Sequence, residues 1–314
     1  MERSPFYARR HRGMENRPLH ELPIITREEL IGRVDDVVTA PDMRKGAQGD
    51  AAKALDRYRV GTTGGASGRP AMLLWNDAEW ATMLASYARA LEWACVPLRP
   101  GRPTRIALIT SPRPSHTTAL VTAGLAQQLV HVLPIDPNEP LGSMVARLEP
   151  FQPDVLVTYP SVARPLSELA LAGRLGIRPR AVLTTAEVLT RATRLHVLQA
   201  FRVEPYDLYS TAETAGIAAE CALHEKHLFE DLVIPEVVDR DGRAVPLGTP
   251  GSRVLVSVLF SRTMPLIRYE ITDRIALRAG SCPCGRPFAL LDRVDGRSED
   301  HLPALSRKSA RALN

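Results

Sequence analysis

The sequence predicts an α/β fold with a largely parallel sheet flanked by helices and a smaller β-rich subdomain. Short β-type runs alternate with helical patterns through the first two thirds of the chain, and this alternation is typical of βαβ units. From residue 228 onward no long helical period appears, and apolar runs separated by turn residues replace it. The composition, 45% hydrophobic and 24% charged over 314 residues, excludes disorder or a coiled coil for the whole chain.

Residues 1–58 are polar and interrupted by prolines, so we expect a helical lead-in, with one helix starting at the threonine cap of Thr26-Arg-Glu-Glu-Leu30. Residues 59–227 are expected to form the α/β body. Asn76-Asp-Ala-Glu79 predicts a capping box ahead of an amphipathic helix. The strands predicted after it are 105–110, 130–134, 155–159, 181–184 and 206–209, and the helices are 116–128, 140–149, 160–172 and 190–201.

Residues 228–300 are expected to form the β-rich subdomain. Val233–Val238 and Arg253–Phe260 predict strands, and Asp239-Arg-Asp-Gly242 predicts a turn. The tail, residues 301–314, is basic and weakly periodic, and we expect it to be loosely ordered.

The charge pattern gives no reason to expect a nucleic-acid partner. Forty Lys and Arg residues against 35 Asp and Glu leave a net charge of +5, but the basic residues are scattered rather than clustered. No apolar run approaches the length of about 18 residues that a membrane span needs, and the start lacks an apolar signal-peptide core. We therefore expect a cytoplasmic protein without a membrane partner.

A glycine- and hydroxyl-rich loop at Thr62–Pro70 could surround a polyphosphate. Glycines let backbone N–H groups close around an anion, hydroxyls add donors, and an arginine adds positive charge. The loop is not a Walker A motif, because Gly-x4-Gly-Lys-Ser/Thr is absent. A flexible turn is the alternative and is the commoner role of such a loop alone. The residues it would offer to phosphates are Thr63, Gly64, Gly65, Ser67, Gly68 and Arg69.

Two further segments carry carboxylates. Glu213 follows the strand predicted to end at Tyr209, and a carboxylate at the carboxyl end of a strand can hold Mg²⁺ against phosphates; a solvated acid is the alternative. Asp273 could accept hydrogen bonds from ribose hydroxyls, or could instead pair with Arg268 or Arg274.

Three cysteines and a histidine form a candidate metal site in the β-rich part. Three thiolates and an imidazole satisfy a tetrahedral Zn²⁺ with no open position, as a structural site requires. His224 is the competing ligand, and buried thiols without metal are the alternative to a site. The remaining cysteine, Cys95, is expected to be buried on an apolar helix face. The predicted ligands are Cys221, His227, Cys282 and Cys284.

In this order and spacing, the segments resemble the AMP-forming acyl- and aryl-adenylating superfamily, and within it the phenylacetate-CoA ligase-like branch. The resemblance covers about residues 5–300. Its motifs are Pro5-Phe-Tyr7, Leu22–Leu30, the phosphate loop, Thr184–Thr190, Tyr209–Glu213, Pro265–Tyr269 with Asp273, and the hinge-like Asp295-Gly-Arg-Ser-Glu-Asp300.

The resemblance implies the large N-terminal domain of an adenylate-forming enzyme. Such an enzyme activates a carboxylic acid, in this branch an aromatic one, with ATP and Mg²⁺, releases pyrophosphate, and commonly passes the acyl group to coenzyme A. Many members of the branch also have a structural Zn²⁺ site. The resemblance implies that Glu213 holds Mg²⁺ and that Glu213, Ser67 and Arg69 form the catalytic group. It further implies ribose binding for Asp273, the adenine neighbourhood for Ala186, Glu187 and Tyr209, and ribose or phosphate binding for Arg297.

The chain also departs from the family pattern. Ala66 and Ala212 replace hydroxyl residues and Ser210 replaces glycine, and one lost charged hydrogen bond is worth about ten- to hundredfold in rate or affinity. Only residues 301–314 follow the hinge, where the family continues into a domain that carries the adenylation lysine. We therefore expect slow adenylate formation and no thioester from this chain alone.

Two alternatives remain. One is a non-catalytic homologue that binds a nucleotide or a partner. The other is a ligase that delivers the acyl group to an amine, a carrier protein or another small nucleophile, with a separate protein supplying the missing domain.

Overall fold

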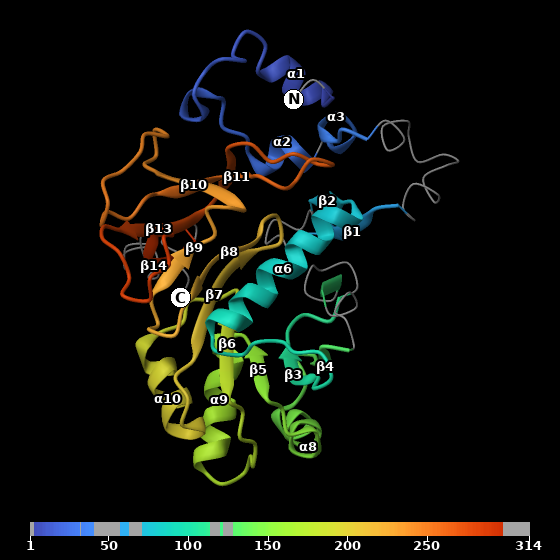
Figure 1. The fold of residues 1–314 in the computed structure, drawn as a ribbon, viewed down its shortest axis with the longest axis vertical. Helices are drawn as coiled ribbons and strands as arrows, with labels where there is room; N and C mark the ends of the chain where they lie inside the picture. Colours follow the sequence, from blue (N-terminus) through green and yellow to red (C-terminus); the bar gives the residue numbers. More distant parts are fainter. Residues whose placement is uncertain are drawn as a thin grey trace, which may run out of the picture.

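The computed structural model describes residues 3–31, 33–40, 57–62, 71–113, 120–121 and 128–297. In this part of the chain a nine-stranded mixed sheet forms the centre of the molecule (Figure 1). Its order is β13 (Asp273–Arg278), β14 (Leu290–Arg297), β9 (Lys226–Leu228), β8 (Ala215–Glu220), β7 (Tyr206–Thr211), β6 (Ala181–Thr185), β5 (Val155–Thr158), β3 (Thr104–Ile109) and β4 (Val130–Ile135). Neighbours from β4 to β7 are parallel, and neighbours from β7 to β13 are antiparallel.

Helices cover both faces of the parallel half, as buried parallel strands require. On one face, α8 (Leu141–Phe151), α9 (Pro160–Leu171) and α10 (Arg191–Phe201) pack on residues such as Ala107 and Val182. The neighbouring residue Ile106 points to the other face and packs with Leu91 of α6 (Asp77–Trp93). The predicted α/β architecture is confirmed, and the predicted strands and the helices at 140–149, 160–172 and 190–201 agree with it to within two residues. Most of the helix predicted at 116–128 lies outside the described residues.

The capping box predicted for α6 is confirmed. The Glu79 backbone N–H donates to Asn76 Oδ1 at 2.9 Å, and the Asn76 N–H donates to Glu79 Oε2 at 2.8 Å. The second oxygen of the buried Glu79 carboxylate accepts from the backbone of Arg262 and Thr263. One glutamate therefore both caps the helix and ties it to the loop that leads into β12.

A separate antiparallel sheet contains β10 (Val233–Val238), β11 (Arg253–Val258) and β12 (Tyr269–Ile271). The predicted turn at 239–242 follows β10, and Gly242 N–H donates to the Asp239 carbonyl. β13 and β14, from the same 228–300 segment, pair within the central sheet instead. This segment therefore contributes to both sheets, and the domain boundary at residue 228 stays a prediction. A short ribbon, β1 (Arg59–Thr62) with β2 (Met72–Trp75), precedes α6.

The N-terminal segment forms short helices that pack against the small sheet: α1 (Pro5–Arg10), η1 (Leu19–Glu21), α2 (Arg27–Ile31) and α3 (Val34–Val37). The Tyr7 hydroxyl donates to the Pro265 carbonyl at 2.9 Å, and Ile25 forms a parallel bridge with Tyr269. Thr26 caps α2, as its motif predicts, by accepting from Glu29 N–H at 3.4 Å.

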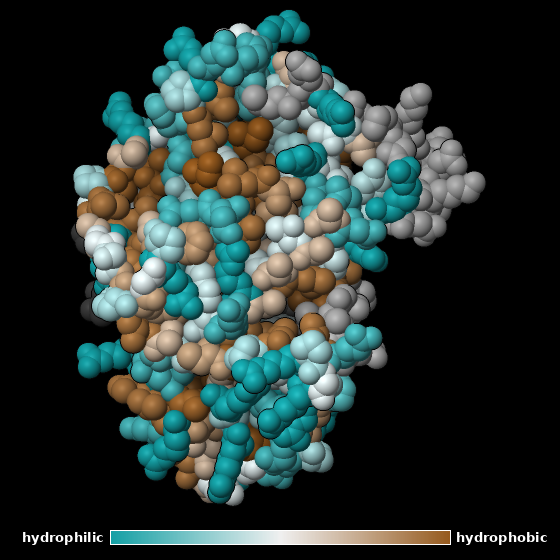
Figure 2. Space-filling view, in the orientation of Figure 1, coloured by the Kyte–Doolittle hydropathy of each residue, from teal (hydrophilic) through white to brown (hydrophobic). Residues whose placement is uncertain are grey.

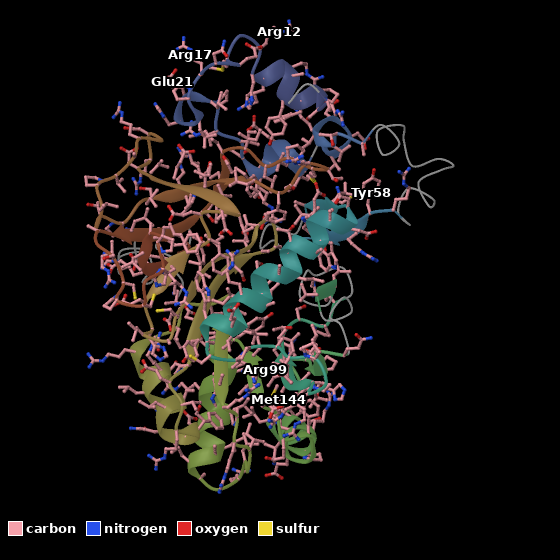
Figure 3. All side chains as sticks on the ribbon, viewed as in Figure 1. Arg12, Arg17, Glu21, Tyr58, Arg99 and Met144 are labelled. Atoms are coloured by element: carbon pink, nitrogen blue, oxygen red, sulfur yellow. The ribbon has the colours of Figure 1, made fainter. Side chains whose placement is uncertain are left out.

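The outer surface of this segment is polar. Arg12, Arg17 and Glu21 lie on its outside, at the top of the molecule (Figure 3), and Arg17 pairs with Glu21 at 2.9 Å. Hydrophobic residues gather over β10 and β11 below it (Figure 2). Among the described helices, none combines the length and the apolar character needed to cross a bilayer.

Candidate active site

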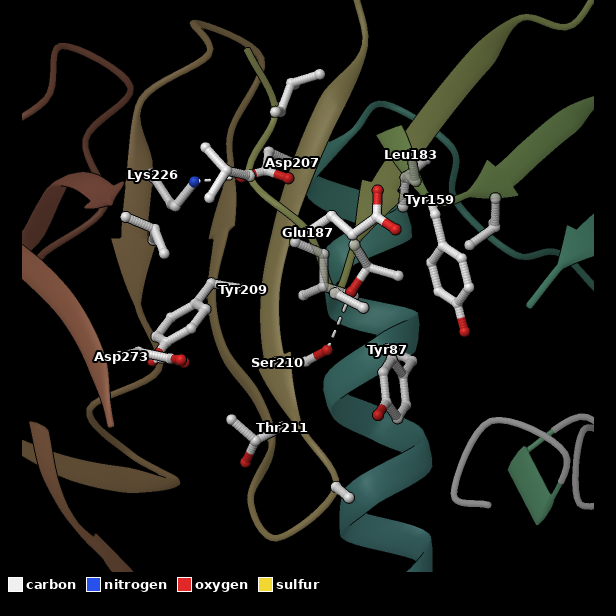
Figure 4. A pocket seen from close by; sticks show the side chains of 18 of the residues that line it. Tyr87, Tyr159, Leu183, Glu187, Asp207, Tyr209, Ser210, Thr211, Lys226 and Asp273 are labelled. Atoms are coloured by element: carbon white, nitrogen blue, oxygen red, sulfur yellow. Dashed lines mark hydrogen bonds and ion pairs between the residues drawn. The ribbon is translucent and has the colours of Figure 1, made fainter. Parts of the chain in front are cut away.

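A cavity of about 1060 Å³ opens where β3, β5, β6 and β7 end (Figure 4). Segments that are far apart in the sequence line it, among them residues 185–189 at the end of β6, residues 207–213 of β7 and its turn, and residues 269–273 around β12. The carboxyl ends of parallel strands are where α/β sheets place their ligands.

The structure brings together most of the predicted nucleotide-site residues that it describes. Those that line the cavity are Ala186, Glu187, Tyr209, Glu213 and Asp273. Thr62, at the end of β1, also lines it, so the predicted phosphate loop starts at the cavity wall. The loop residues Thr63, Gly64, Gly65, Ser67, Gly68 and Arg69 lie outside the described residues. Arg297 is the last residue of β14, where its backbone is in register with Asp273.

Tyr209 and Asp273 form a hydrogen-bonded pair at one side of the cavity (Figure 4). The Tyr209 hydroxyl donates to Asp273 Oδ2 at 2.8 Å. Tyr209 is buried on β7, and Asp273 is the first residue of β13. Arg268, one of the alternative partners, pairs with Glu236 at 3.0 Å. Asp273 thus lies at the cavity with its carboxylate oriented by a phenol.

A second such pair joins Tyr269 and Glu213. The Tyr269 hydroxyl donates to Glu213 Oε1 at 3.1 Å. Burial, followed by the negative charge of Glu213, raises the pKa of Tyr269 far above its ordinary value, so the hydroxyl stays a donor. Glu213 lies in the turn between β7 and β8. Sequence reasoning missed Tyr269 as a site residue, because its only sequence signal was its place within the Pro265–Tyr269 motif.

Ser210, at the position where the sequence comparison expected a glycine, is engaged by a neighbouring hydroxyl. Its Oγ lies 3.1 Å from Thr185 Oγ1, and Tyr87 of α6 lines the same cavity (Figure 4). Burial raises the pKa of Tyr87 to about 12. The serine therefore fills the space between β6, β7 and α6 at the cavity wall.

Ala186 and Glu187 lie in the turn after β6. Ala186 has φ of +66°, a left-handed conformation that costs a non-glycine residue about 1–2 kcal/mol. The Glu187 carboxylate accepts from the backbone and the hydroxyl of Ser161 at the start of α9, both at 2.9 Å. The carboxylate of Glu187 is thus held by α9.

The sequence patterns also did not predict the buried ion pairs at one end of the cavity. The Lys226 ammonium pairs with Asp207, and their side chains are only 12% and 11% exposed. Asp207 also accepts from the Thr184 hydroxyl at 3.0 Å. Nearby, Arg194 pairs with the buried Glu220 at 2.6 Å. A lone lysine between a glutamate and a histidine gives no local signal of burial, so only the fold reveals this cluster.

The predicted zinc ligands come together: His227 lies in β9, Cys221 follows β8, and Cys282 and Cys284 lie in the loop before β14. Their ligand atoms all lie within 4.8 Å of one another; Cys221 Sγ is 3.8 Å from Cys282 Sγ, and Cys284 Sγ is 3.3 Å from His227 Nε2. Zn–S bonds of about 2.3 Å give tetrahedral edges of about 3.8 Å, so the donor set fits zinc. Burial lowers the pKa of His227, which favours the neutral imidazole that binds metal.

Two further sequence-based expectations concern His224, as a competing metal ligand, and the burial of Cys95. His224 stacks on Tyr206, with ring centroids 4.5 Å apart, and lies 3.2 Å from Glu220, so it is not part of the cluster. The expected burial of Cys95 is wrong. Because α6 ends at Trp93, Cys95 lies beyond the helix with φ of +60° and is exposed.

Comparison of the sequence with known proteins finds relatives, although no protein-family model matches. The chain is 29% identical over 264 residues to a phenylacetate-coenzyme A ligase of Thermus thermophilus, a match that covers 78% of this chain and 55% of the relative. A phenylacetate-coenzyme A ligase of Escherichia coli is 31% identical over 161 residues, or 48% of this chain and 36% of that enzyme. The chain thus spans about half the length of the first of these relatives.

Solved structures share the fold. A 2-hydroxyisobutyryl-CoA ligase in the postadenylation state, in complex with 2-HIB-AMP, superposes with a TM-score of 0.76 at 21% identity and covers 95% of this chain and 65% of its own. ATP-bound MatB from Rhodopseudomonas palustris superposes with a TM-score of 0.53 at 14% identity, over 77% of this chain and 48% of its own. The chain is thus similar in sequence to phenylacetate-coenzyme A ligases and shares its fold with a 2-hydroxyisobutyryl-CoA ligase.

Proposed function

We propose that the cavity binds Mg-ATP and a carboxylic acid and joins them into an acyl-adenylate, with release of pyrophosphate. One observation carries this proposal: Tyr209, Glu213 and Asp273, from segments far apart in the chain, line one cavity at the carboxyl ends of parallel strands. Its support comes from relatives that are phenylacetate-CoA ligases and from a structural neighbour bound to 2-HIB-AMP.

The predicted nucleotide-site residues would each bind a different part of Mg-ATP. Asp273 would accept hydrogen bonds from the ribose hydroxyls, and the ring of Tyr209 with the 186–187 turn would flank the adenine. Glu213 would hold Mg²⁺, which when bound neutralises charge on the phosphate oxygens. The loop at 63–69 and Arg297 would contact phosphate or ribose.

In the reaction, a carboxylate oxygen of the acid forms a bond to the α-phosphorus while the bond to the bridging oxygen of pyrophosphate breaks. This step needs in-line alignment and charge stabilisation rather than a protein nucleophile. The side chains that orient the two reactants would therefore determine the rate.

The acid would lie on the apolar side of the cavity. Side chains from α6 and the parallel strands line this side, and hydrocarbon burial rather than charge would hold the acid there. An aromatic acid fits these walls and the chemistry of the relatives. The apolar residues are Leu91, Ile106, Leu108, Val130, Val132, Val157 and Leu183.

The relatives are coenzyme A ligases, so coenzyme A is the first acyl acceptor to test, followed by an amine and a carrier-protein thiol.

We also assign a structural Zn²⁺ to the three cysteines and His227. In this role the metal would fasten the strand that follows Glu213 to the loop before β14 and would not touch substrate.

Acid-dependent release of pyrophosphate from Mg-ATP tests the proposal. Across a panel of aryl and aliphatic acids, we expect release with some aryl acids and none without acid. Asp273→Asn and Glu213→Gln should each lower kcat/KM about tenfold or more, because each removes a charged acceptor. Asp241→Asn is the matched control, since Asp241 lies in the exposed turn after β10. Nucleotide binding without release for any acid would favour a non-catalytic binder instead.

A further inference from the structure

The contact between Tyr269 and Glu213 joins the two sheets at the cavity. Tyr269 begins β12 in the small sheet, whereas Glu213 lies in the turn of the β7–β8 hairpin of the central sheet. The hydroxyl donates to Glu213 Oε1 at 3.1 Å, and both residues line the cavity. The position of the glutamate therefore depends on a residue 56 positions away in the sequence.

Tyr269 is held firmly from both sides. It is 2% exposed and pairs with Val256 of β11. On its other side, the Ile25 N–H donates to the Arg268 carbonyl at 3.0 Å and the Glu270 N–H donates to the Ile25 carbonyl at 2.8 Å. A buried phenol in a strand bonded along both edges has little conformational freedom left.

Glu213 has no comparable support of its own. Its neighbour Ala212 carries no hydroxyl, and the Thr214 hydroxyl is engaged by Thr211 and by the Ala215 carbonyl. Among the described residues, Tyr269 is the side chain that hydrogen-bonds to Glu213, and Oε2 of Glu213 has no hydrogen-bond partner there. One carboxylate oxygen is therefore held, and the other is left for a ligand.

We propose that Tyr269 is a positioning residue that holds Glu213 Oε1, so that Oε2 is available to Mg²⁺ in the cavity. This inference rests on the proposed function, in which Glu213 binds the metal of Mg-ATP. A carboxylate that is ordered before its ligand arrives loses less conformational entropy on binding. Tyr269 thus acts on the metal through Glu213 and does not touch the reacting atoms.

The test compares the Mg²⁺ dependence of ATP binding, measured by calorimetry, in the parent chain and in Tyr269→Phe. We expect the Mg²⁺ concentration for half-maximal binding to rise about tenfold, because a hydrogen bond to a charged group is lost. ATP binding in excess EDTA should not change. In a Glu213→Gln background, Tyr269→Phe should add little, because coupled residues are not additive.

Tyr7→Phe is the matched control. Tyr7 is also fully buried, and its hydroxyl bonds the backbone of Pro265 and Ile267 without reaching Glu213. It should lower thermal stability but leave the Mg²⁺ dependence unchanged. Replacing Tyr269 with 4-aminophenylalanine, which keeps a donor at the same reach, should restore the parental Mg²⁺ dependence and should fold even if Tyr269→Phe does not.

The outcomes separate this inference from the function on which it rests. A parent chain that binds no Mg-ATP contradicts the proposed function, and the inference fails with it. A parent that binds Mg-ATP while Tyr269→Phe shows the same Mg²⁺ dependence overturns the positioning role alone. An equal shift in Tyr7→Phe, or no restoration by 4-aminophenylalanine, overturns it as well.

Discussion

Two tyrosine hydroxyls each orient one of the carboxylates that line the cavity. Tyr209 bonds to Asp273 and Tyr269 bonds to Glu213, across 64 and 56 sequence positions. The motifs predicted that Tyr209, Glu213 and Asp273 serve one ligand. They did not predict the pairing, because contacts between distant segments leave no periodic or local pattern in a sequence.

Cys95 shows where local reasoning failed. This residue was expected on a helix face, but α6 ends two residues earlier and leaves the thiol exposed. The end of a helix therefore decides whether a side chain just beyond it is buried.

Metal content tests the assigned zinc site. We expect about one zinc per chain, lost with a fall in melting temperature in Cys284→Ser, because closed metal sites contribute directly to folding. Tryptophan fluorescence should change too, since the Trp93 ring lies 5.7 Å from His227 and 4.7 Å from the Arg286 guanidinium. Cys95→Ser, at the exposed cysteine, is the control and should keep the metal. Zinc-free protein, or unchanged melting in Cys284→Ser, would remove the site.

At the scale of elements, strongly patterned segments were predictable. The parallel strands β5 and β6 begin with continuous apolar runs, and α6 starts at an explicit capping box. β8 was not predicted, because Ala215–Glu220 contains small residues and a single isoleucine. The reason is tertiary: a side chain at Gly216 would lie 2.6 Å from the Phe229 ring. Close packing thus selects residues with low strand propensity.

The link between α6 and the segment after β9 predicts a pH dependence of stability. Arg89 donates two 2.7 Å hydrogen bonds to Asp231, and these bonds, with the charge of Arg89, hold the pKa of Asp231 below its ordinary value. Because the pKa of Asp231 is lower in the folded state, its ionisation stabilises the fold at pH values above the ordinary aspartate pKa. This contribution disappears as the pH falls through the folded-state pKa.

Urea unfolding of the parent and of Asp231→Asn measures this contribution. Because both side chains are partly exposed, we expect Asp231→Asn to be less stable by about 0.2–1 kcal/mol at neutral pH. The difference should shrink below about pH 4, near the ordinary aspartate pKa. A difference that is constant down to that pH would show that the ion pair does not cause it.

At the scale of the molecule, distant parts of the chain surround one cavity. The N-terminal segment contributes Thr26 and Arg27 to the lining and supports β12 through Ile25. The predicted fold class follows from the alternation of strands and helices, but its division of the chain at residue 228 does not foresee that β13 and β14 complete the central sheet. Local patterns specify elements, whereas the pairing of the last strands depends on contacts across the whole fold.

The central claim is that this cavity forms an acyl-adenylate, and oxygen transfer tests it most directly. The purified chain is incubated with Mg-ATP, an accepted aryl acid labelled with ¹⁸O in its carboxyl group, and a nucleophile such as coenzyme A or hydroxylamine. If an acyl-adenylate forms and is then attacked at its carbonyl carbon, mass spectrometry will find one ¹⁸O atom in the AMP product. Acid-dependent AMP formation without ¹⁸O, with the label retained in the acid, would contradict the account.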